Sequence, residues 1–153
     1  MKKETSIKMN NKGFSLVELI IAIAIMAVLI GILAPQFIKY VERSRNLTDI
    51  TNAQEITNAI QVYAADTTAT PAFTARAYTV TVAASGITAP APITNATALG
   101  NALIEAGVTK VNCKSKTAWK TYTVTATVAA DGKISFTYSA TGTNAADFVD
   151  AME

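Results

Sequence analysis

The fold of this chain is decided by the stretch FSLVELIIAIAIMAVLIGILA, residues 14–34. From Leu19 to Ala34 no side chain carries a charge or a hydrogen-bonding group, and Glu18 is the only charged residue of the whole stretch. An α-helix rises about 1.5 Å per residue, so the stretch is long enough to cross the hydrocarbon core of a bilayer, about 30 Å thick. We therefore predict a membrane-spanning helix over residues 14–35.

The segment before this helix, MKKETSIKMNNKG at residues 1–13, is polar and basic. Lysines outnumber acidic residues in it by four to one, so the positive-inside rule places it in the cytoplasm and the rest of the chain outside. A secretory signal peptide has an apolar stretch of about 7–15 residues that ends at a small-residue cleavage site. Here the apolar run continues through Pro35 into helix-like sequence, so we expect the helix to be retained.

After Pro35 the apolar residues recur at spacings of three or four, which predicts an amphipathic helix over residues 36–65 that continues the first. Gly31 and Pro35 are the expected points of kinking or melting, because proline removes a backbone hydrogen bond and glycine weakens its turn. The expected buried stripe is Ile38, Val41, Leu47, Ile50, Ala53, Ile56, Ile60, Tyr63 and Ala64. The expected solvated face is Lys39, Glu42, Arg43, Arg45, Asp49 and Glu55.

Beyond residue 66 the sequence changes to short runs in which apolar residues alternate with threonine. YTVTV at 78–82, YTVTATV at 122–128 and ISFTY at 134–138 predict strands, and the Asp131-Gly132 turn joins the last two into a hairpin. A short helix is expected over residues 95–106, capped by Thr94 or Asn95 and ended by Gly107. The predicted fold class is α+β, with a long N-terminal helix packed on a small antiparallel sheet within one head domain, residues 36–153.

Composition argues against an enzyme and against a cofactor or metal site. The chain has no histidine and a single cysteine, Cys113, which removes the usual zinc, haem and iron–sulfur constellations and any disulfide within the chain. No phosphate-binding loop, nucleophile elbow or metalloprotease motif occurs. We predict no catalytic residue, and Cys113 is expected to be a partly buried apolar side chain.

Basic and acidic side chains nearly balance once residues 1–13 are removed, so nucleic acid is not the expected partner. The mature chain has one cluster that mixes charge and aromatic rings, as a contact with single-stranded DNA requires. We expect instead a solvated loop with the tryptophan packed on the sheet. The cluster is Lys110, Lys114, Lys116, Lys120, Trp119 and Tyr122.

The segment Lys12-Gly13-Phe14-Ser15-Leu16-Val17-Glu18, followed by the apolar run, resembles the class III leader of type IV pilins and of the related pseudopilins. The resemblance implies a pilin-like fold and cleavage by a prepilin peptidase between Gly13 and Phe14. The same enzyme would then methylate the new amine of Phe14. The resemblance also implies that Glu18 pairs with the Phe14 amine of a neighbouring subunit, and that the helix melts near Pro35 in the filament.

By this resemblance the chain is a structural subunit of a type IV pilus. It would be a precursor in the cytoplasmic membrane and then part of an extracellular filament, extracted by an assembly ATPase through a platform membrane protein. One alternative is a pseudopilin of a type II secretion or competence system. Major pseudopilins often bind calcium, but Asp131, Asp147, Asp150 and Glu153 are too scattered to predict such a site. Another is a surface domain on a signal anchor that never polymerises, and Glu18 within an otherwise apolar stretch argues against it. The alternative role for Glu18 itself is that it snorkels to the headgroups near the helix start.

Overall fold

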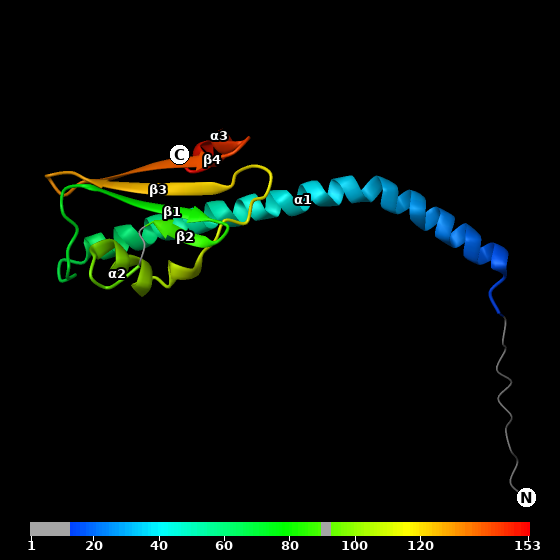
Figure 1. Cartoon of the computed structure of the whole chain (residues 1–153), viewed down its shortest axis with the longest axis horizontal. Helices are drawn as coiled ribbons and strands as arrows, with labels where there is room; N and C mark the ends of the chain where they lie inside the picture. The colour runs from blue at the N-terminus through cyan, green and yellow to red at the C-terminus, as the bar shows by residue number, and fades with distance from the viewer. Residues whose placement is uncertain (1–12, 90–92) are drawn as a thin grey trace, which may run out of the picture. The chain divides into compact units, whose positions relative to one another are not determined.

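The computed structural model describes residues 13–89 and 93–153 of the chain (Figure 1). The chain divides into two compact units, Met1–Lys39 and Tyr40–Glu153. Each unit is described by itself, and the second is called the head. The predicted leader lies outside the described residues except for Gly13.

The long helix α1 spans Leu16–Ala65, which confirms the prediction of one helix through both apolar and amphipathic segments. The helix is continuous at Gly31 and Pro35. The melting that we expect at these two residues concerns an assembled state, so it stays a prediction. Within the first unit every described residue of α1 is exposed, because its described residues form this one helix and give the apolar side chains nothing to pack against.

The head contains a four-stranded antiparallel sheet in the order β2-β1-β3-β4 (Figure 1). Its elements are β1 (Ala77–Ala83), β2 (Gly86–Ala89), α2 (Ala98–Glu105), the 3-10 turn η1 (Val108–Lys110), β3 (Thr121–Val128), β4 (Ile134–Thr141) and α3 (Ala145–Asp150). The three predicted strands and the hairpin are confirmed. The four-residue β2, η1 and the six-residue α3 were not predicted, since runs this short carry too few residues to show a period.

Alternation along the strands sorts the side chains of the sheet as predicted. In β3 the apolar residues from Tyr122 to Val128 are buried, while the threonines between them point to the other face. The buried face covers the second half of α1, where Ala53, Ile56 and Ile60 are almost fully buried in the same core cluster. This burial confirms the centre of the predicted stripe. Of its first three members, Ile38 and Leu47 are more than half exposed and Val41 is half-buried.

Two local signals end elements in the head. Gly132 takes a φ of 83° in the β3–β4 turn, and Gly107 takes a φ of 73° directly after α2, where its N–H bonds the Ile104 carbonyl at 3.0 Å. Both are left-handed conformations that favour glycine, so the roles expected of the hairpin turn and of Gly107 are confirmed.

The predicted cap of the short helix was wrong. Helix α2 begins at Ala98, and the Thr97 side chain, rather than that of Thr94 or Asn95, accepts a hydrogen bond from the Gly100 N–H at 3.0 Å. The Thr94 carbonyl lies so close to Gly100 that a Cβ atom there would clash with it. The chain before Thr97 therefore folds over the helix start instead of extending it.

Candidate functional site

The N-terminal end of α1 holds Glu18 next to the predicted cleavage position. Helix α1 begins at Leu16, so Ser15 is its N-cap residue and Glu18 occupies the third helical position. The Glu18 Oε2 atom accepts the Ser15 N–H at 3.0 Å. The carboxylate thus satisfies one of the free backbone donors at the helix start, as the glutamate of a capping box does.

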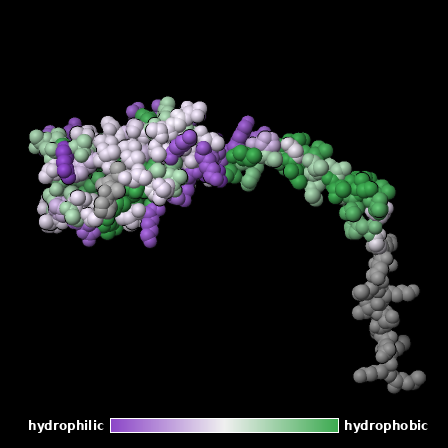
Figure 2. Space-filling view, in the orientation of Figure 1, coloured by the Kyte–Doolittle hydropathy of each residue, from purple (hydrophilic) through white to green (hydrophobic). Residues whose placement is uncertain are grey.

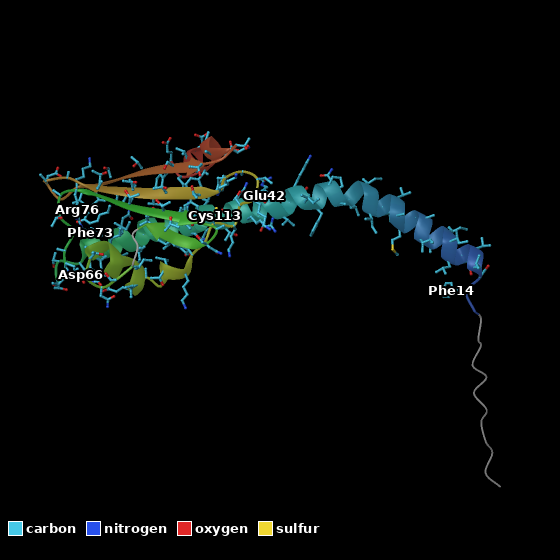
Figure 3. All side chains as sticks on the ribbon, in the orientation of Figure 1. Phe14, Glu42, Asp66, Phe73, Arg76 and Cys113 are labelled. Carbon is cyan, nitrogen blue, oxygen red and sulfur yellow. The ribbon has the colours of Figure 1, made fainter. Side chains whose placement is uncertain are left out.

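This contact was not foreseen, although the pattern Ser15-Leu16-Val17-Glu18 is the sequence signature of a capping box. It places the carboxylate beside the backbone nitrogen that follows Phe14. The Phe14 side chain itself is 89% exposed (Figure 3), and a Cβ atom at Gly13 would meet nothing within 4 Å. No described residue therefore covers either side of the Gly13–Phe14 bond in the single chain.

The apolar surface of the first unit has no partner among the described residues of that unit. Its aliphatic side chains from Leu16 to Leu33 are each between 52% and 72% exposed, and Figure 2 shows this part of the chain as hydrophobic. By length and composition α1 is able to cross a membrane. Soluble monomers rarely expose apolar patches of more than a few hundred Å². This surface therefore requires lipid or the helices of other molecules around it.

In the head, two carboxylates of α1 bind the loop between η1 and β3, and the prediction that Asp49 is solvated was wrong. Asp49 is fully buried. Its Oδ1 accepts the Lys114 N–H at 2.7 Å, and its Oδ2 accepts the Ser115 N–H at 2.8 Å. Oδ2 also accepts the Trp119 Nε1–H at 2.9 Å and the Cys113 thiol at 3.3 Å. A charge can be buried here because both carboxylate oxygens accept hydrogen bonds, one at Oδ1 and three at Oδ2.

Glu42, two helical turns earlier on the same side of α1, binds the next residues of the loop, so it too departs from the predicted solvated face. Its Oε1 accepts the Ser115 hydroxyl at 2.9 Å and the N–H groups of Lys116 at 2.7 Å and Thr117 at 2.8 Å. Burial of the side chain opposes its ionisation, but these hydrogen bonds outweigh burial and lower the pKa of Glu42 to about 2. Figure 3 labels Glu42 and Cys113 at this end of the head.

The clamp formed by Asp49 and Glu42 accounts for the neighbouring cysteine and aromatic residues. Cys113 is only 5% exposed, and burial together with the nearby Asp49 charge raises the pKa of its thiol to about 12. The thiol is therefore unreactive at neutral pH. Trp119 and Tyr122 are 2% and 0% exposed, as expected for packing on the sheet. Both rings are buried, so they give the basic cluster no exposed aromatic face on which the bases of single-stranded DNA could stack.

The lowered pKa of Glu42 predicts how acid weakens the head. A carboxyl whose pKa is lower in the folded state stabilises that state above its unfolded pKa, 4.5, and loses this effect as the pH falls towards 2. Above pH 5 we expect Glu42→Gln to lower the free energy of unfolding by about 1–3 kcal/mol, since charge-assisted bonds to several donors are lost. Between pH 4.5 and 2 this difference from the wild type should shrink. Urea unfolding at a series of pH values measures it, and a difference that stays constant over that range would contradict the assignment.

Among residues 13–89 and 93–153, no group of three or more histidine, cysteine, aspartate or glutamate side chains is placed to hold a metal ion. The four carboxylates considered for calcium, from Asp131 to Glu153, do not come together into such a group in this part of the chain.

Comparison with known proteins gives one match. Residues 8–34 match the family described as the prokaryotic N-terminal methylation motif. The matched segment covers the end of the predicted leader and the apolar part of α1, and none of the head. The predicted resemblance of this segment to a class III leader is thereby confirmed. Neither the curated proteins nor the solved structures contain a match to the chain.

Proposed function

We propose that this chain, whose methylation motif makes it a precursor of the type IV pilin and pseudopilin type, is a structural subunit of a type IV pilus. One observation carries the proposal: the methylation motif extends into a helix whose apolar half is exposed throughout. Lipid covers this half in the precursor, and the same half of neighbouring subunits covers it in the filament. The apolar surface thus serves first as an anchor and then as the filament core.

The precursor resides in the cytoplasmic membrane with its basic leader inside and its head outside. Prepilin peptidase cuts between Gly13 and Phe14 and methylates the Phe14 amine. The assembly ATPase then drives the subunit out of the bilayer through the platform membrane protein. Each subunit buries its helix against different surfaces of its neighbours, and such heterologous contacts grow into an open helical filament.

Glu18 acts at assembly in this proposal. In the single chain its carboxylate bonds the Ser15 N–H, close to where cleavage creates the Phe14 amine. A carboxylate within the hydrocarbon core costs about 2.5–3.5 kcal/mol or more unless it is paired. The positive amine of a neighbouring Phe14 supplies that pairing when the subunit docks.

The N-terminus of the mature protein tests this function. Mass spectrometry of protein sheared from the cell surface should give a first peptide that begins at Phe14 and carries one added methyl group. The same peptide should be missing from a strain without prepilin peptidase, which should keep the whole precursor in its membrane. Surface protein that begins after Ala34 would overturn the proposal, because the apolar helix would then be lost on export.

A further inference from the structure

We propose that neighbouring copies of this chain, assembled as described above, join through opposite charges on their heads. A cationic rim on one copy contacts an acidic groove on the next. The rim consists of Arg43, Arg45, Lys114 and Lys116. The groove is lined by α1, α2 and the turn that follows α2, and it contains Glu55 and Glu105. This inference rests on the proposed function, since it names the head contact that accompanies packing of the helices.

The clamp creates the rim. The carboxylates of Glu42 and Asp49 accept hydrogen bonds from backbone N–H groups of the loop between η1 and β3. The backbone of this loop therefore faces α1, and its lysine side chains point outward. Lys114, Lys116 and Arg43 are exposed. Among the described residues the single ion pair is Arg45 with Glu42, at 3.5 Å. The four cations of the rim therefore outnumber the two carboxylates beside them, and this part of the head keeps a positive excess.

The groove has the opposite character. It has a volume of about 660 Å³ and lies open at the surface. Glu55 and Glu105 are both exposed and neither forms an ion pair with a described residue. Beside them Val62 is 73% exposed, which is a large apolar surface for a side chain next to a groove. A partner that brings positive charge on aliphatic stems would complement both properties, and lysine and arginine have this form.

We propose that a second copy of the chain occupies the groove, because each chain carries both the rim and the groove at different positions along α1. Arg43 and Glu55 are twelve residues apart on α1, which is about 18 Å along the helix axis. Two parallel copies displaced along that axis bring the rim of one to the groove of the other, and both surfaces remain free to repeat the contact. Such a head-to-tail contact propagates as a filament instead of closing into a dimer.

Charge reversal tests the contact in cells that express the full chain and the assembly machinery. The groove variant is Glu55→Lys with Glu105→Lys, and the rim variant is Lys114→Glu with Lys116→Glu. Neither changes the backbone N–H groups that the clamp uses. Each should lower the yield of sheared filaments by about tenfold or more, because like charges then face each other. The chain that carries all four changes should restore the yield.

Lys133→Glu, at the exposed hairpin turn, is the control for charge alone and should assemble as the wild type does. As a second measurement, Glu105→Cys combined with Lys116→Cys should give disulfide-linked ladders in filaments under oxidation. The buried Cys113 should give none by itself. Thermal unfolding of each variant head excludes losses that come from misfolding.

The outcomes separate this inference from the function on which it rests. If the wild type forms filaments and both reversed variants assemble equally well, the charge contact is wrong while the pilin function stands. If the rim variant fails to assemble and the chain with all four substitutions does not restore the yield, the rim contacts another partner, such as anionic lipid headgroups. That result overturns the inference. If the wild type forms no filament at all, the proposed function itself has failed.

Discussion

Asp49→Ala is expected to destabilise the head by roughly 3–5 kcal/mol, one of the two largest effects that we predict. The change leaves the N–H groups of Lys114, Ser115 and the Trp119 indole without their acceptor. Each buried donor that loses its partner costs about 1–3 kcal/mol. Because small domains are stable by only about 5–15 kcal/mol, the variant head should be partly unfolded at physiological temperature.

Urea unfolding followed by tryptophan fluorescence measures this loss, since Trp119 is the only tryptophan and its indole bonds Asp49 directly. Glu55→Ala is the matched control, because Glu55 is an exposed carboxylate on the same helix. It should change the free energy of unfolding by no more than about 0.5 kcal/mol. Asp49→Asn should lie between the two variants, because the amide keeps one acceptor oxygen but turns an N–H₂ group towards other donors. Equal stability of Asp49→Ala and Glu55→Ala would contradict the clamp.

Much of the fold could be predicted because its signals are local. The apolar run and the spacing of three or four after Pro35 predict α1 from neighbouring residues alone, and the alternation of valine with threonine does the same for β1 and β3. The Asp131-Gly132 turn fixes the β3–β4 hairpin. These patterns repeat within one element, so they require no knowledge of what the element packs against.

The clamp could not be predicted in this way. Glu42 precedes Arg43 and Asp49 follows Thr48 on α1, and a carboxylate beside such polar residues is ordinarily solvated. Their donors are more than sixty residues further along the chain and are mainly backbone N–H groups, which leave no trace in the sequence. The signal at Ser15 and Glu18 differs, because the Ser-x-x-Glu pattern is local and is enough to predict the capping contact.

Glu18 carries the prediction with the largest effect on function. Replacing it by alanine should leave membrane insertion, cleavage after Gly13 and the stability of the head intact, because the residue belongs to the first unit and not to the head. Methylation of Phe14 is expected to fall. Filaments should be absent or rare, because the docking subunit can no longer pair with the amine of its neighbour.

Glu18→Gln separates the two roles that the carboxylate could have. The glutamine oxygen can still accept the Ser15 N–H and cap the helix, but it carries no charge to pair with an amine. If pairing matters, the glutamine variant should assemble as poorly as the alanine variant. If capping alone matters, it should assemble normally.

The direct measurement is a count of filaments that bind an antibody against the head, on cells that express the assembly machinery together with wild-type, Glu18→Ala or Glu18→Gln protein. Mass spectrometry confirms beforehand that each protein is cut at Phe14. If the subunit polymerises through its N-terminal helix, we expect labelled filaments on wild-type cells and few or none on cells with either variant. Wild-type cells without labelled filaments, or equal numbers with all three proteins, would contradict it.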